Sequence, residues 1–227
     1  ADPDYETKSS YSFTVTATDA AGTSAATTVT FSITNVDEVV PTITSGATGT
    51  DLAENSGAGQ TVYTITADAN DGGTITGYDL GSDDAPYLSV DASGVVTLTA
   101  DPDYETKSSY GFDVLTFDAS GVSNAKFVTF SITNVNDIVP TITSGTTGND
   151  LVENSGANKL VYSITADAND GGTISSYTLG GTDAALLNLF TSSENNAIVR
   201  LIADPDYETK SSYSFTVTAT DAAGTSA

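Results

Sequence analysis

Acidic and amide side chains recur at fixed places in this sequence, and each place is an expected loop at the end of a β-strand. The set that surrounds residue 137 has six carboxylates and two amides. It comprises Glu54, Asp103, Glu105, Asn136, Asp137, Asp167, Asn169 and Asp221. Gathering six carboxylates in one small region costs on the order of several kcal/mol of repulsion unless a cation neutralises them. Oxygen-only ligands predict Ca²⁺, which accepts about 6–8 oxygens, whereas such loops rarely provide the strict octahedron that Mg²⁺ requires.

The composition of the chain excludes several other kinds of chemistry. The 227 residues include no His and no Cys, which removes transition-metal ligands, thiolate sites and disulfides. Without His to activate a Ser or Thr nucleophile, we expect no enzyme activity. The formal charge of −24, from 30 acidic and 6 basic residues, disfavours nucleic acid and anionic membrane surfaces as partners. Such a surface suits polyvalent cations or an extracellular setting.

The loops recur because the sequence is a repeat. Residues 1–25 and 203–227 are identical, and a diverged third copy begins at Ala100. The Asp-Pro-Asp-Tyr-Glu string recurs at offsets of 99 and then 103 residues, so the true period is either one unit or a pair of alternating units of 202 residues. Repeats of this size predict small tandem domains. We expect the end of one unit at 1–38, a complete unit at 39–137, and a unit without its final strand at 138–227.

Within a unit, apolar and polar residues alternate with the two-residue period of half-buried strands. We expect strands in the complete unit near 42–45, 59–67, 74–80, 86–90, 95–99, 109–117 and 125–134, separated by Gly, Asn, Asp and Ser. No helical period of useful length is present. Seven short strands in about 100 residues predict an all-β fold of tandem Greek-key, Ig-like β-sandwiches.

The order and spacing of five motifs resemble the cadherin repeat, especially the cadherin-like repeats of large bacterial surface adhesins. The motifs are LAEN at 52–55, DYE at 103–105, NVND at 134–137, DAN at 167–169 and TDAAG at 220–224. In that family such loops bind Ca²⁺ between domains. The resemblance implies a second ligand set at the first junction, made of Asp4, Glu6, Asp37, Glu38, Asp68, Asn70 and Asp118, while Glu153, Asp206 and Glu208 begin a further set.

The motifs depart from the family pattern at several ligand positions. Asn35 and Asn134 open the linkers where the family has Asp, and Asn70 and Asn169 stand where it has a second Asp. Because each change removes a negative charge, we expect one or two ions per junction rather than the family's three.

The resemblance implies a calcium-rigidified extracellular rod, secreted or attached to the cell surface, that acts in cell adhesion as a stalk or filament unit. Its partners would be neighbouring repeats of the same chain, with self-association into fibres as a further possibility and no direct membrane insertion. A different hypothesis is a module that binds a glycan or surface directly, although short loops and the lack of Trp disfavour it.

Several local alternatives stay open at this point. The acidic loops can be merely solvated. The DANDGG string at 68–73 begins like an EF-hand loop, but position twelve is Asp79 rather than Glu and strands are expected on both sides. The recurring Lys8, Lys107 and Lys210 are interpreted as surface charges that compensate nearby acids, with an intramolecular isopeptide bond as the less favoured interpretation.

Overall fold

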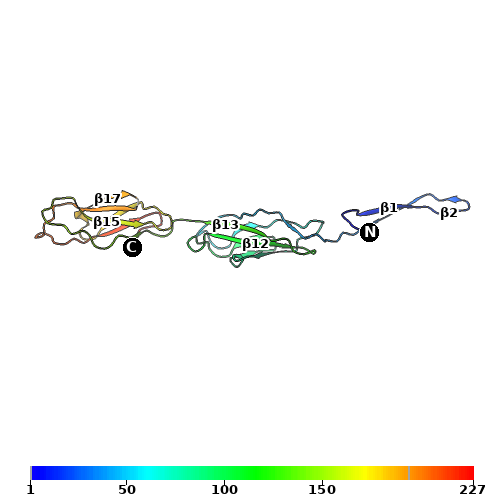
Figure 1. Ribbon diagram of the computed structural model, residues 1–227, viewed down its shortest axis with the longest axis horizontal. Helices are drawn as coiled ribbons and strands as arrows, with labels where there is room; N and C mark the ends of the chain where they lie inside the picture. The colour runs from blue at the N-terminus through cyan, green and yellow to red at the C-terminus, as the bar shows by residue number, and fades with distance from the viewer. Residues whose placement is uncertain (1, 194) are drawn as a thin grey trace. The chain divides into compact units, whose positions relative to one another are not determined.

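A computed structural model describes residues 2–193 and 195–227 (Figure 1). The chain divides into two compact units, Ala1–Thr133 and Asn134–Ala227. The described residues contain strands and two short 3₁₀ helices, and no α-helix. Over the same residues, no helix is long and apolar enough to cross a membrane.

The first unit begins with an antiparallel strand pair, β1 (Ser10–Val15) and β4 (Thr27–Ser32). A short second pair, β2 (Thr18–Asp19) and β3 (Gly22–Thr23), lies between them in the sequence. No further strand of the described residues joins the β1–β4 sheet. Both strands therefore stay solvent-exposed, and Phe31 keeps 50% of its surface accessible.

The rest of the first unit is a β-sandwich. Its elements are β5 (Thr42–Ile43), β6 (Leu52–Ala53), β7 (Gln60–Thr64), β8 (Ala67–Asp68), β9 (Gly77–Gly81), η1 (Ala85–Tyr87), β10 (Leu88–Val90), β11 (Val95–Leu98), β12 (Ser109–Phe117) and β13 (Lys126–Thr133). One sheet has the order β10–β11–β7 and the other β6–β13–β12–β9, while β5 pairs with β8. All pairs are antiparallel except β6–β13, which is parallel.

The core of this sandwich follows from the alternation in its two longest strands. Every second residue of β12 and β13 is buried, which places one face of the pair against the opposite sheet. Phe130 stacks on Tyr110 with ring centroids 4.9 Å apart, and Phe112 meets Phe130 edge-on at 6.3 Å. Val62, Val96 and other residues of the first sheet complete the core from the opposite side.

The second unit repeats this plan, but its described residues form no counterpart of β6 or of β13. Its elements are β14 (Thr141–Ile142), β15 (Lys159–Asp167), β16 (Ser176–Gly180), η2 (Ala184–Leu186), β17 (Leu187–Ser193), β18 (Asn196–Leu201) and β19 (Thr216–Thr220). The sheets are β14–β15–β18–β17 and β16–β19. β17 has 7 residues where its counterpart β10 has 3, so the four-residue insertion lengthens a hairpin.

The all-β sandwich predicted from the sequence is confirmed, and the strand predicted at 109–117 has the bounds of β12. Other strands differ in extent. The strand expected at 59–67 is divided into β7 and β8, that at 74–80 begins only at Gly77, and the first part of 86–90 is η1. The sequence prediction missed β6, whose two residues are a strand only because they pair with distant β13.

Candidate metal centres

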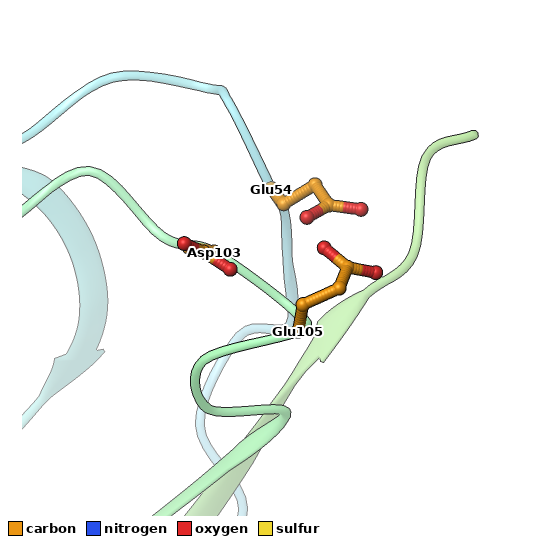
Figure 2. Close-up of side chains that lie close together, drawn as sticks. All are labelled: Glu54, Asp103 and Glu105. Atoms are coloured by element: carbon orange, nitrogen blue, oxygen red, sulfur yellow. The ribbon is translucent and has the colours of Figure 1, made fainter. Parts of the chain in front are cut away.

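Three carboxylates predicted as ligands meet at one end of the first sandwich. Oxygens of Glu54, Asp103 and Glu105 lie within 4.8 Å of one another. Figure 2 shows the carboxylates of Glu54 and Glu105 facing each other, with Asp103 beside them. Glu54 directly follows β6, whereas the other two lie in the turn that leads to β12. The parallel pairing of β6 with β13 fixes this place, because the Glu54 N–H donates to the Thr133 carbonyl at 3.2 Å.

The members of this cluster differ in surroundings. Glu54 is only 3% exposed, and its Oε2 accepts the Tyr104 N–H at 2.9 Å. Asp103 caps its own turn, since it accepts the N–H of Thr106 at 2.9 Å and the hydroxyl at 2.8 Å. The Thr106 backbone N–H, and then its hydroxyl, hold the pKa of Asp103 below its ordinary value. Asp103 therefore stays ionised, and its remaining lone pairs are able to accept a cation.

The same turn recurs in both other copies. Asp4 accepts the N–H and hydroxyl of Thr7, and Asp206 accepts those of Thr209. In the second unit Glu153, Asp206 and Glu208 also lie within 4.8 Å of one another. All three are exposed, in contrast to Glu54, because no strand lies beside residues 151–152 in the described part of this unit.

A second cluster forms around the linker residues Asn35–Glu38. The Glu38 N–H donates to Oδ2 of Asp71 at 3.1 Å, and the Asn35 amide donates to the Asp71 carbonyl. These bonds attach the linker to the loop of residues 68–73. Asp118 lies opposite, in the loop after β12, and is 9% exposed.

Several oxygens of this cluster are buried without hydrogen-bond partners. Among the residues that the structure describes, they are Oδ1 of Asn35, both carboxylate oxygens of Asp37, Oδ1 of Asp71 and Oδ2 of Asp118. The other oxygen of Asp118 accepts three bonds, from the backbone and hydroxyl of Ser120 and from the Gly121 N–H. Buried carboxylate oxygens almost always have partners. An unpartnered set made only of oxygens suits a hard divalent cation.

The raised pKa values of the linker carboxylates also indicate that a cation would be favourable at this place. Burial, followed by the charges of Asp118 and Asp71, raises the pKa of Asp37. The pKa of Glu38 is raised by burial and then by Glu6, Asp71, Asp4 and Asp37. Carboxylates from residues before, within and after the linker therefore repel one another across a single small region of the first unit.

A glycine makes room for the linker aspartate. A Cβ on Gly73 would lie 2.7 Å from Cγ and 2.9 Å from Oδ1 of Asp37. A Cβ on Gly172, at the same place in the second unit, would lie 2.8 Å from Cγ of Asn136. Only the bare backbone allows the linker side chain to lie this close.

The second linker, Asn134–Asp137, shows the same attachments with one difference. The N–H groups of Asp137 and Ile138 donate to Oδ2 of Asp170 at 2.8 and 3.1 Å. Asn136 stands where the first linker has Asp37, and its amide donates to Oδ2 of Asp221 at 3.1 Å. Asn136 therefore forms a hydrogen bond with Asp221, whereas Asp37 in the first linker is repelled by Asp118, the residue equivalent to Asp221.

Two of the three amides predicted as ligands, Asn70 and Asn169, also fasten the chain that follows the linker. Asn70 and Asn169 have left-handed backbones, with φ of 60° and 55°, which Asn tolerates better than most residues. The Asn70 amide donates to the Val40 carbonyl at 2.6 Å, and the Asn169 amide donates to that of Val139 at 2.6 Å. An aspartate at either position would have no side-chain N–H to donate to this carbonyl. The hydrogen bond therefore explains why Asn stands where the cadherin pattern described above has a second Asp. The Asp68 carboxylate accepts the backbone N–H of Asn70 at 2.8 Å, and the Asp167 carboxylate accepts that of Asn169 at 2.9 Å.

The sequence prediction missed Asp71 and Asp170, which accept the backbone N–H groups of the linkers. Both lie in the repeated DANDGG string, so their recurrence was visible. Their role depends on backbone donors more than thirty residues away, which no local motif identifies.

Two of the three recurring lysines, Lys107 and Lys210, compensate nearby acids as interpreted from the sequence, whereas Lys8 lies over the ring of Tyr11. Lys107 pairs with Asp84 and Lys210 with Asp183, each at 3.0 Å. The hydrogen bond to Asp84 raises the pKa of Lys107. Asp183 also accepts the Ser214 N–H at 2.7 Å, and this bond and Lys210 hold the pKa of Asp183 below its ordinary value.

Comparison with curated proteins finds sequence relatives among animal cadherins, although no protein-family profile matches the chain. The chain is 30% identical to mouse protocadherin Fat 4 over 228 residues, and this alignment covers 96% of this chain and 4% of that protein. It is 26% identical to the cadherin EGF LAG seven-pass G-type receptor fmi-1 of Caenorhabditis elegans, over 94% of this chain and 9% of that protein. The chain thus spans a small part of these relatives.

Solved structures agree on the fold. Repeats EC22–24 of mouse cadherin-23 superpose with a TM-score of 0.74 at 21% identity, over all of this chain and 74% of that one. The extracellular domain of protocadherin gamma B4 gives 0.72 at 21% identity, over 96% of this chain and 35% of that one. The chain therefore has the fold of tandem cadherin repeats.

Proposed function

We propose that this chain is a Ca²⁺-binding, non-enzymatic segment of an extracellular tandem-repeat protein, and that it acts in cell adhesion as a spacer that calcium stiffens. We extend the proposal to a large surface adhesin of bacterial type as the parent protein on the motif resemblance alone, because the relatives that the comparison finds are animal cadherins. The acidic surface, with a formal charge of −24, agrees with an extracellular setting.

One observation carries the proposal. Glu38 of the first linker has carboxylates from three successive segments around it: Asp4 and Glu6 before the linker, Asp37 within it and Asp71 after it. Nearby, oxygens of Asp37, Asp71 and Asp118 are buried and unpartnered. Such an arrangement is unfavourable by itself and becomes favourable when a divalent cation shares the oxygens.

Some residues of the chain would bind the cation, and others determine the shape of the site. The carboxylates at positions 37, 71 and 118 would contact the cation, and their equivalents in the second unit are Asn136, Asp170 and Asp221. The Glu54, Asp103 and Glu105 cluster would contribute a separate set of oxygens. Asn70 and Gly73 shape the place, the first through its bond to Val40 and the second through its missing side chain. The bound cation supplies positive charge that removes the repulsion among the carboxylates.

Stiffening follows from linkage. A cation that binds only when the linker and its loops are assembled stabilises that assembly in proportion to the logarithm of its concentration. When calcium falls, repulsion returns and the linker is free to leave its loops. Ion binding thereby changes the bending freedom and the protease resistance of the chain.

Calorimetric titration of the 227-residue chain with Ca²⁺ tests the proposal, together with small-angle scattering before and after addition of chelator. We expect saturable binding, and chelator should change the scattering curve. Glu105→Gln and Asp118→Asn should each weaken binding. Asp79→Asn removes the same charge from an exposed residue outside the clusters and should bind as the parent does. Absence of saturable binding, or equal weakening by Asp79→Asn, would refute the proposal.

A further inference from the structure

The face of the sheet β6–β13–β12–β9 that points away from the core carries apolar side chains beside carboxylates. The residues of β12 on this outer face are Gly111, Asp113, Leu115 and Phe117. Directly opposite Asp113 lies Phe127 of β13, which is 54% exposed, and directly opposite Leu115 lies Asp79 of β9. Val122, which is 44% exposed, forms a bridge to Phe117 and extends the apolar area. Each of two carboxylates therefore has an apolar side chain as its cross-strand neighbour.

The other copies of the repeat have hydroxyl side chains at the same positions. Thr occupies the equivalents of Asp113, Leu115 and Phe117 in both of them, at Thr14, Thr16, Thr18, Thr216, Thr218 and Thr220. The equivalent of Asp79 in the second unit is Thr178, and the equivalent of Phe127 in the first copy is Thr28. The core residues of the same strand, at positions 110, 112 and 114, are identical in all three copies. The outer face of the first sandwich therefore differs in surface chemistry while the core beneath it is unchanged.

Neighbouring differences support the new side chains. A Cβ on Gly111 would lie 2.6 Å from Cζ of Phe127, and both other copies have Ser at this position. Gly111 thus leaves room for the Phe127 ring to lie across β12. Ser82 has a left-handed backbone with φ of 73°, where the second unit has Gly181 with φ of 87°, and its hydroxyl donates to Oδ2 of Asp113. This hydrogen bond holds the Asp113 carboxylate at the border of the apolar area and offsets the strain at Ser82.

Charge determines which kind of partner fits this face. The two basic residues of the first sandwich, Lys107 and Lys126, make other contacts, with Asp84 and with a loop carbonyl. Two copies of the face packed together would bring four carboxylates of Asp79 and Asp113 towards one another, which disfavours a second copy as the partner. Complementarity requires a partner that offers both positive charge and apolar contact.

We propose that this outer face, formed by Asp79, Asp113, Leu115, Phe117 and Phe127, binds a segment of a partner protein that presents arginine side chains. A guanidinium forms two parallel hydrogen bonds to a carboxylate and also stacks on an aromatic ring, whereas an ammonium does neither in this way. The aliphatic stem of arginine packs against apolar surface. Paired carboxylates and apolar side chains, as at Asp113 and Phe127, satisfy both parts of the side chain. The interaction uses none of the proposed calcium ligands.

Binding of a synthetic peptide in which Arg alternates with Val tests the proposal, measured by fluorescence anisotropy with the 227-residue chain. A matched peptide with Lys in place of Arg has the same charge. We expect saturable binding of the Arg peptide, about 10-fold tighter than that of the Lys peptide, both in saturating Ca²⁺ and in chelator. Equal affinities for the two peptides, or absence of saturable binding, would overturn the proposal. Binding in both conditions distinguishes this result from a failure of the calcium proposal.

Paired variants locate the interaction on this face. Phe127→Thr installs the residue of the first copy without a change of charge and should weaken binding about 10-fold, as expected for a central aromatic contact. Phe190→Thr makes the same substitution at a ring of the second unit that is 47% exposed, and should bind as the parent does.

Asp79→Thr should weaken binding about threefold, because its carboxylate borders the apolar area. Asp150→Thr removes the same charge from an exposed residue of the second unit and should have no effect. Equal weakening within either pair of variants would show that the peptide responds to the acidic surface in general, and would overturn the assignment.

Discussion

Phe31 and Phe130 provide an internal comparison of what burial contributes to stability, because the same residue occupies the same repeat position in two settings. Each ring stacks on the tyrosine of the neighbouring strand: Phe31 on Tyr11 at 5.2 Å and Phe130 on Tyr110 at 4.9 Å. Phe130 is 2% exposed and Phe31 is 50% exposed. Substituting each by Ala removes a similar stacking contact. The difference between the two losses of stability therefore measures the contribution of burying the ring.

The expected magnitudes are far apart. Truncating a fully buried Phe costs about 3–5 kcal/mol, because a cavity remains. For a domain of this size each kcal/mol lowers Tm by about 4–8 °C, so Phe130→Ala should lower the melting temperature of the first sandwich by about 12 °C or more. Water replaces the lost ring at Phe31, and the β1–β4 pair alone is marginal. Phe31→Ala should therefore change that melting temperature by about 2 °C or less.

Differential scanning calorimetry of the full chain, at a concentration where it is monomeric, measures both effects. The heat capacity transition of residues 39–133 should move in Phe130→Ala and stay in place in Phe31→Ala. The reasoning is refuted if the two substitutions lower the transition equally, or if Phe130→Ala costs less than about 1 kcal/mol, which is typical of a surface change.

Three further substitutions test the linker and the ion pairs. Asp37→Asn should raise Tm in chelator, because the amide can bond to Asp118 as Asn136 bonds to Asp221, and a fall in Tm would contradict this. Gly73→Ala should weaken Ca²⁺ binding about 10–100-fold in a calorimetric titration, because its Cβ displaces Asp37 without removing a charge. Gly46→Ala, which meets no atom within 4 Å, is the control, and equal affinities in the two variants would exclude the steric argument. The pKa of Asp183 lies below its unfolded value of 3.8, so its stabilisation is present above that pH and is lost as pH falls through the folded pKa. Asp183→Asn should therefore flatten the acid limb of urea-unfolding curves, and an unchanged limb would contradict the assignment.

The sequence predicted those parts of the fold that depend on local alternation. β12 has the predicted bounds because all nine of its residues alternate between core and solvent. β6 could not be predicted in this way, since two residues carry no period and their pairing with β13 joins positions eighty residues apart. The start of β9 was predicted too early, because residues 74–76 alternate but only Thr76 bonds to β12, through the Phe117 carbonyl.

The candidate site shows a similar division. Repeat spacing predicted the ligand positions of the Glu54, Asp103 and Glu105 cluster, and the structure brings these three together. It could not reveal Asp71, which acts on linker backbone, or the amide role of Asn70, which depends on a left-handed turn and a distant carbonyl. Both missed roles are non-local hydrogen bonds between a loop and the chain that enters the unit.

The hydrogen bond between Asn136 and Asp221 has a consequence for a long array built on the 202-residue pattern. Joints of the Asp37 kind and joints of the Asn136 kind would alternate along it, and the former would carry one more carboxylate within the linker to repel its neighbours at low calcium. As the ion is withdrawn, every second joint would loosen before its neighbours, so such an array would soften in two stages and keep pairs of domains together at intermediate calcium.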